Sequence, residues 1–302
     1  MELKSLTRHF NSDSPPRRLL CAAISLRSII AQSNHRSGLP VKCGVRQIGG
    51  VKLEIAADKN FSEWAKSFSG CDGGNISGSI WFCGIEFGGN DELLNFQEIS
   101  APPYVNEEFR GRFKTYQYNW KVLKIYSTLV GYDPSKYKKV YAASRAFDKE
   151  SDTFKMNLYP IAFRNVSDDL WSEHHYRSTG LPTKPLYQAW CQIERFPIIK
   201  SWVSNNKPKV IVCTGTTYLR EFVMAFCGIE NVFCKLEEQS LDGGNLFWTI
   251  INDGETALFV TPFLGQGGLK SDAQIECHAL KMKELCDEKL GDEWCKPVCI
   301  DA

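Results

Sequence analysis

The sequence lacks the C-x-x-C motif, although it contains twelve cysteines. Zinc ribbons and iron–sulfur sites are usually held by such cysteine pairs, so we expect no metal and no cofactor. Cys83, Cys213 and Cys227 lie inside apolar runs. These positions predict buried, reduced thiols of a cytoplasmic protein rather than a disulfide framework.

A strong net charge and a long apolar segment are also missing. The 36 basic and 35 acidic residues neither require a polyanionic partner nor exclude a local groove for phosphate. No apolar run reaches the roughly 18 residues of a transmembrane helix, so we expect no membrane partner. The 43% apolar and 24% charged residues, without repeats or low-complexity tracts, indicate an ordinary globular protein, which we expect to be a monomer.

One segment near the N-terminus imitates a targeting signal, with basic residues at 17–18 followed by an apolar run over residues 19–26. The run stops at Arg27 and resumes with helical spacing, and the polar leader is long for a secretory signal. We therefore interpret it as an amphipathic helix. It belongs to a predicted N-terminal extension, residues 1–50, which precedes a main domain over residues 51–302.

Short apolar runs alternate with helical patterns along the main domain. This alternation predicts an α/β fold, a three-layer α/β/α sandwich with a mainly parallel central sheet. The predicted strands are 51–56, 79–85, 153–158, 209–213 and 257–261, and the predicted helices are 61–68, 116–129, 186–205, 218–226 and 271–285. Residues 71–75 indicate a turn, and residues 231–252, centred on Asp242-Gly243, indicate an inserted β-hairpin.

Polar residues and glycines follow three of these strands, where ligands of parallel α/β sheets bind. The first strand runs into Gly84-Ile85-Glu86-Phe87-Gly88-Gly89, the second into Asn157 before Tyr159-Pro160, and the last into Thr261-Pro262-Phe263-Leu264. A tight turn that needs glycine would also explain the first motif, and an Asx turn before proline would explain the second.

In this order, and each at the end of a strand, the three motifs resemble those of the uracil-DNA glycosylase superfamily over residues 75–285. The first motif is similar to the superfamily pattern G-[QIEM]-[DNA]-P-[YG], with Phe87 in place of proline. The resemblance implies that Glu86 is the catalytic residue, which orients the attacking water, and that Asn157 reads a flipped base. Thr261 replaces the family His or Asn, and Phe263 replaces its Ser.

The same resemblance implies two further sets of site residues. The base would lie against Ile85, Phe87, Gly88, Asn157, Phe96 and Thr261, with Tyr104 as an alternative stacking platform to Phe96. DNA contacts would come from Phe263, Leu264, Gln266, Lys270, Ser271, Thr214, Gly215 and Thr216. Phe263 and Leu264 are candidates for a wedge that enters the base stack, although an apolar pair after proline is also an ordinary core anchor.

Gly88 stands where uracil-specific members have a tyrosine that blocks substituents on C5 of the pyrimidine. The resemblance therefore implies a DNA glycosylase for uracil or a 5-modified pyrimidine, acting on duplex or single-stranded DNA. The antiphage branch, which removes glucosylated 5-hydroxymethylcytosine from viral DNA, is the relative we suspect.

Two alternatives stay open. Phe87 and Thr261 depart from the pattern, which favours a catalytically silent module that binds nucleic acid or a nucleotide. A hydrolase of small nucleosides would need neither a wedge nor a basic groove.

Overall fold

The computed structural model describes residues 45–48, 51–54, 56–89, 96–165 and 167–300. The chain divides into two units, residues 1–54 and 55–302. In the first unit, β1 (Val45–Ile48) pairs antiparallel with β2 (Val51–Glu54). The sequence predicts the second of these strands but not its partner, and the predicted amphipathic helix lies outside the described residues.

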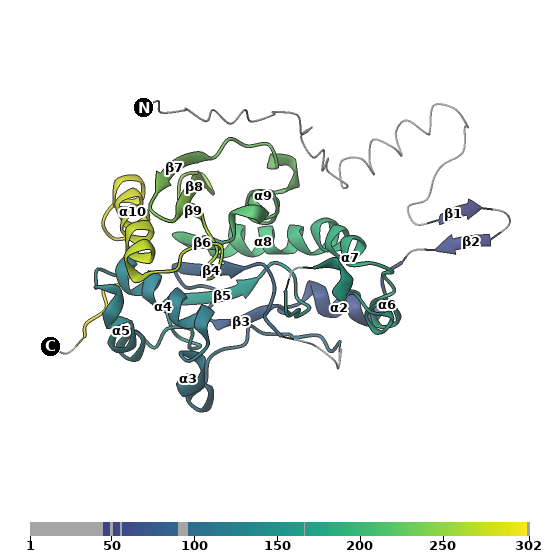
Figure 1. Ribbon diagram of the computed structural model, residues 1–302, viewed down its shortest axis with the longest axis horizontal. Coiled ribbons are helices and arrows are strands. Elements are labelled where there is room, and N and C mark those ends of the chain that lie inside the picture. The colour runs from purple at the N-terminus through teal and green to yellow at the C-terminus, as the bar shows by residue number, and fades with distance from the viewer. Residues whose placement is uncertain (1–44, 49–50, 55, 90–95, 166, 301–302) are drawn as a thin grey trace, which may run out of the picture. The chain divides into compact units, whose positions relative to one another are not determined.

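The second unit is built on a seven-stranded sheet with the order β3-β5-β4-β6-β9-β8-β7 (Figure 1). The strands are β3 (Cys71–Gly74), β4 (Ile80–Gly84), β5 (Thr153–Asn157), β6 (Val210–Thr214), β7 (Glu237–Leu241), β8 (Gly244–Ile251) and β9 (Thr256–Thr261). The four central strands, β5, β4, β6 and β9, run parallel, and antiparallel strands complete both edges. This confirms the predicted α/β class and the hairpin, whereas the sheet is mixed, with parallel strands at its centre only.

Helices connect the strands and pack against the sheet. They are α2 (Lys59–Lys66), α3 (Glu107–Phe113), α4 (Gln117–Leu129), α5 (Tyr137–Ser144), α6 (Glu173–Thr179), α7 (Lys184–Trp190), α8 (Phe196–Asn206), α9 (Leu219–Cys227) and α10 (Asp272–Leu290). None of the helices within the described ranges combines the length and the apolar character needed to cross a membrane.

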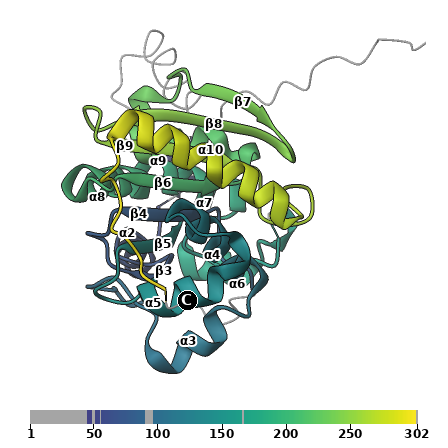
Figure 2. The same cartoon turned by 90° about the vertical axis from the view of Figure 1, so that its left-hand side faces the viewer.

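Alternate side chains of the central strands enter two different hydrophobic cores, as the period of two in a strand requires. On β4, Trp81 and Cys83 pack with α2, α7, α8 and α9, whereas Ile80 and Phe82 pack with α4, α5 and α10. In Figure 2, α10 crosses in front of the strands, with α4 and α5 on the same side. Burial of the Phe82 ring alone contributes on the order of 2–3 kcal/mol to the free energy of unfolding.

The cysteines predicted to be buried and reduced, Cys83, Cys213 and Cys227, are buried and free. Residues 71–74 form β3, where the sequence indicates a turn over residues 71–75. A Cβ at Gly74 of β3 would collide with the backbone of Thr153, so glycine lets β3 and β5 approach closely rather than marking a turn.

A five-residue π-helical turn, η3 (Cys191–Arg195), joins α7 to α8. The whole stretch is therefore helical, in agreement with the helix predicted over residues 186–205. Arg195 is fully buried, and its guanidinium donates to the carbonyl oxygens of Leu158 at 2.9 Å and Ser69 at 2.6 Å. These bonds tie the helical stretch to the loops at the ends of two strands.

A buried histidine fastens α10 to β9 and to the hairpin. The hydroxyl of Thr261 donates to Nδ1 of His278 over 2.9 Å, and the Nε2–H of His278 donates to the carbonyl oxygen of Asp242 over 3.1 Å. The backbone acceptor decides this tautomer, because a carbonyl oxygen can only accept. Burial lowers the pKa of His278 below its ordinary value.

We expect His278→Gln to reduce the pH dependence of folding. A histidine whose pKa is lower in the folded state stabilises the fold less as the pH falls below about 6.5, because the unfolded chain binds the proton more readily. Wild-type protein should therefore lose unfolding free energy between pH 7 and pH 5, and His278→Gln should lose less over this range while being about 1 kcal/mol less stable at pH 7. Urea denaturation at several pH values measures this, with the exposed His174→Gln as control. An unchanged slope in His278→Gln would contradict the prediction.

Candidate functional site

The order of the four parallel strands places a switch point at the carboxyl end of β4. The chain passes from β4 to β5 on one side, and the next parallel strand, β6, lies on the other side of β4. Loops at such a point diverge, and ligands of open α/β sheets bind there. Gly215, which follows β6, has a φ of +119°, and a Cβ built on it would lie 3.6 Å from Cγ1 of Ile85. The loops after β4 and β6 therefore lie close together where they leave the sheet.

The loop after β4 also runs beside the loop after β5. The backbone N–H of Tyr159 donates to the carbonyl of Ile85 at 2.9 Å, and that of Phe163 donates to the carbonyl of Phe87 at 3.0 Å. These bonds extend the parallel pairing past the ends of both strands. Glu86 lies between the two bonded positions, so its backbone is held on both sides.

The carboxyl group of Glu86 is buried, with only 5% of its side chain exposed. Its Oε1 lies 3.2 Å from Nζ of Lys184, and its Oε2 is buried without a hydrogen-bond partner among the described residues. Burial raises the pKa of Glu86, and the neighbouring Lys184 charge offsets part of this rise. The arrangement leaves one carboxylate oxygen for a further partner.

Lys184, the first residue of α7, is a site residue that the sequence did not reveal. Its side chain is fully buried, and its Nζ lies 4.0 Å from the ring centroid of Phe163 and 3.5 Å from the carbonyl oxygen of Asn165. It follows Glu86 by 98 residues in the chain and occurs in no motif. Only the packing of α7 against the loops could identify it.

Asn157, the last residue of β5, lies beside the end of β4 and is 3% exposed. Its Nδ2 donates to Oδ2 of Asp72 at 3.3 Å and to the carbonyl oxygen of Gly70 at 3.4 Å. Asp72 in turn forms an ion pair with the buried ammonium of Lys155. Because a Cβ at Gly84 would collide with Oδ1 of Asn157, the amide lies directly against the glycine that ends β4.

Tyr118 of α4 connects this region to the segment after β9. Its hydroxyl lies 2.7 Å from Oγ1 of Thr214, and its ring stacks on that of Phe263 with centroids 6.1 Å apart. Nζ of Lys155 lies 5.0 Å from the centroid of the same Tyr118 ring. Like Asp72 and Lys155, Tyr118 belongs to no motif and was missed in the sequence.

The structure separates the two wedge candidates. Phe263 is 47% exposed, whereas Leu264 is 2% exposed and belongs to the hydrophobic core that contains α4 and α10. Leu264 is therefore the core anchor that the sequence left as an alternative, because a side chain packed in a core cannot also enter a base stack. Phe263 keeps an exposed ring that is backed by Tyr118.

Three residues that were expected to line the base instead contact other parts of the protein. Ile85 is buried in the core on the α8 side of the sheet. The ring of Phe96 packs against Phe61 and Trp64, with centroids 5.2 and 4.8 Å away, so it belongs to an aromatic cluster on α2 rather than standing free as a platform. The hydroxyl of Thr261 is directed to His278 on α10.

Several of the remaining residues predicted to contact DNA have structural roles within the fold. Ser271 caps the N-terminus of α10, where its side chain accepts from the backbone of Gln274. Thr214 is buried, and Thr216 is the half-buried first residue of a short 3-10 turn, η4 (Thr216–Tyr218). Gln266 and Lys270 are exposed.

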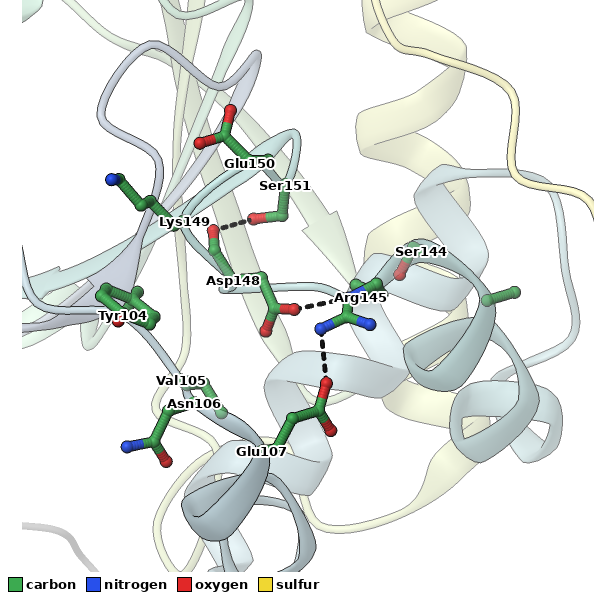
Figure 3. Close-up of a pocket in the computed structure, with 11 residues that line it drawn as sticks. Tyr104, Val105, Asn106, Glu107, Ser144, Arg145, Asp148, Lys149, Glu150 and Ser151 are labelled. Atoms are coloured by element: carbon green, nitrogen blue, oxygen red, sulfur yellow. Dashed lines mark hydrogen bonds and ion pairs between the residues drawn. The ribbon is translucent and has the colours of Figure 1, made fainter.

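A cavity of about 510 Å³ lies elsewhere, beside the residues that precede β5 (Figure 3). Arg145 bridges Glu107 and Asp148 within it, and Tyr104, the alternative stacking platform, lines it. The backbone of Tyr104 lies against Gly73 of β3, which pairs with Lys155 in the middle of β5.

Comparison with known protein families found no family model that matches the chain, and comparison with curated protein sequences found no similar protein. In the part of the chain that the structure describes, no three His, Cys, Asp or Glu side chains gather closely enough to hold a metal ion. The geometry at the ends of β4 and β5 is therefore the basis for assigning a function.

We expect Gly84→Ala to destabilise the protein and Gly88→Ala to leave it unchanged. A Cβ at Gly84 meets the Asn157 amide, whereas no heavy atom of the residues that the structure describes lies within 4 Å of a Cβ at Gly88, whose φ lies outside the left-handed region. Overpacking of this kind costs roughly 1–3 kcal/mol, and an unhindered exposed change stays within about 0.5 kcal/mol. Urea denaturation of both variants checks this, and equal losses would show that Asn157 does not press on β4.

Proposed function

We propose that this protein is a DNA glycosylase that hydrolyses the N-glycosidic bond of a flipped pyrimidine and leaves an abasic site. The observation that carries the proposal is the carboxyl group of Glu86, which lies just beyond β4 with one buried oxygen that has no hydrogen-bond partner among the described residues. The motif resemblance to the uracil-DNA glycosylase superfamily supports the same function. We also propose that the two cores belong to a three-layer α/β/α sandwich.

The chemistry requires an anionic group beside the sugar. Breaking the bond builds positive charge on the deoxyribose and negative charge on the departing base. Glu86 in its ionised form holds and deprotonates water, or stabilises the sugar cation. A general base works best when its pKa is near the operating pH, and burial moves the pKa of Glu86 in that direction.

Base recognition is assigned to Asn157 and to the backbone of the loop after β4. An asparagine amide offers one acceptor and two donors on a short planar arm, which matches the edge of a pyrimidine. Asp72 and the carbonyl of Gly70 accept from the amino group of Asn157, so the amide is fixed before a base arrives and its Oδ1 is the atom left to accept from the base. A fixed amide loses little entropy on binding, which favours recognition.

Contact with DNA is assigned to the segment after β9. Flipping a base costs a few kcal/mol, and an aromatic wedge that fills the gap offsets this cost. Phe263 has the required exposed ring, and Tyr118 supports it from behind. The exposed Gln266 and Lys270 of the same segment are suited to phosphate contacts.

The substrate we favour is a pyrimidine with a large substituent on C5, such as glucosylated 5-hydroxymethylcytosine in phage DNA. The open surroundings of Gly88 support this choice, since the backbone there does not require glycine. We further propose that the protein acts as a cytoplasmic monomer, which agrees with the free state of its described cysteines.

A catalytically silent module that binds nucleic acid or a nucleotide is the second candidate function. The observation that favours it is the ion pair of Glu86 with a fully buried lysine, since such pairs also occur with a purely structural role. Thr261 offers it further support, because its hydroxyl bonds His278. The exposed Phe263, which a hydrolase of small nucleosides would not need, argues against that third alternative.

We expect Glu86→Gln to abolish base excision while DNA binding persists. Loss of a catalytic carboxylate commonly lowers turnover by about 10² to 10⁴. Gel assays for abasic sites, on duplex and single-stranded DNA with uracil, 5-hydroxymethylcytosine or its glucosylated form, measure this. Glu173→Gln, at an exposed glutamate, is the control. A Glu86→Gln variant with more than half of wild-type turnover would falsify the catalytic role, and wild-type protein that binds DNA but excises no base would establish the silent module.

We expect Gly88→Tyr to suppress excision of the bulky base more than excision of uracil. A tyrosine ring at this position would occupy the space beside C5, and packed groups yield little to such a clash. Excision rates of wild type, Gly88→Ala and Gly88→Tyr on both substrates, with melting temperatures alongside, test this. A uniform loss that follows the melting temperature would refute the open-pocket explanation.

A further inference from the structure

The ammonium group of Lys184 has three partners: Oε1 of Glu86 at 3.2 Å, the ring of Phe163 at 4.0 Å and the carbonyl oxygen of Asn165 at 3.5 Å. Each partner comes from the loop after β4 or the loop after β5. None of the side chain is exposed. Lys184 therefore joins both loops of the candidate site to the start of α7.

The position is unfavourable for a lysine on two independent grounds. Removing an ammonium group from water costs free energy that an ion pair only partly returns, and an apolar pair of similar volume is often as stable. Lys184 is also the first residue of α7, after the N-cap Thr183, where the positive end of the helix dipole repels a cation. A charged residue that is unfavourable in its position on two grounds, and that lies beside the ends of two strands, is expected to serve the site.

We infer that Lys184 is a positioning residue for Glu86. Its ammonium group anchors Oε1 of Glu86, leaves Oε2 free for the reacting water and keeps the carboxylate ionised. This inference rests on the proposed function in that Glu86 is taken as the base. Anchoring one oxygen fixes the direction in which the other points. Without the ammonium group, the carboxyl group would be free to rotate and to bind a proton.

Other groups near Glu86 do not supply this charge. Burial, together with the nearby charge of Glu86, raises the pKa of Tyr187 of α7 and that of Tyr218 after β6, to about 12 for Tyr218, so both are neutral at ordinary pH. Glu221 and Asp168, which act on Tyr218, carry the same sign of charge as Glu86. Among the described groups that act on the pKa of Glu86, Lys184 is the cation.

The test measures the protonation of Glu86 directly. Carbon-13 NMR of glutamate-labelled protein, with the Glu86 signal assigned through Glu86→Gln, follows its titration in wild type and in Lys184→Met. Removing the positive charge should raise the pKa of Glu86, because Lys184 lowers it. We expect the titration midpoint to rise by about one pH unit or more, and the acidic limb of any excision profile to move by the same amount, roughly tenfold in rate per unit.

Lys124→Met is the matched control. Lys124 is likewise buried, lies 2.6 Å from the carboxylate of Asp272 and stands 4.5 Å from the ring centroid of Trp120, but it joins α4 to α10 away from Glu86. It should leave the Glu86 midpoint unchanged. A midpoint that does not move in folded Lys184→Met overturns the inference, as does an equal shift in Lys124→Met.

If Lys184→Met does not fold, the melting temperature of the double variant Glu86→Gln/Lys184→Met tests the inference instead. A positioning role predicts that the double variant recovers stability, because the neutral amide no longer needs a cation. Equal loss of melting temperature in single and double variants would make Lys184 structural and overturn the inference. Because the titration needs no substrate, absence of excision by wild type would refute the proposed function while still leaving the role of Lys184 measurable.

Discussion

The register of β4 is the constraint on which the site depends. All five of its residues are buried, and its parallel partners set Gly84 opposite Asn157 on one side and Cys83 opposite Cys213 on the other. A slip by one residue would move every side chain to the other core. Apolar packing of β4 therefore sets where the chain leaves the strand, and the hydrogen bonds of Ile85 and Phe87 then hold the backbone of Glu86 two residues further on.

Much of the fold could be predicted because its signals are local. The apolar runs of β4, β5, β6 and β9, bounded by turn residues, carry the period and length of buried strands, and the Asp242-Gly243 turn marks the hairpin. β3 escaped prediction because Gly73 and Gly74 resemble turn residues, although Gly74 lets β3 approach β5 and Gly73 lets it approach the backbone of Tyr104. Glycine has both uses, and only the neighbouring strand distinguishes them.

The site was predictable only where a residue follows a strand. Glu86 and Asn157 could be named from the sequence, but their partners Lys184 and Asp72 lie 98 and 85 residues away along the chain. Each carboxylate of the site is balanced by a buried lysine, Glu86 by Lys184 and Asp72 by Lys155. Such pairing depends on which helix covers which loop, and no local pattern records it.

The π-helical turn η3 sets the rotational phase between the two helices it joins. The buried apolar residues of α7 and η3, Tyr187 and Cys191, are followed after a step of five by Phe196 and then by Ile199 of α8. An uninterrupted α-helix advances about 100° per residue, so the extra residue in the wide turn keeps both buried stripes on one face. Deleting it would rotate α7 by about that angle against α8 and carry Lys184 off the loops.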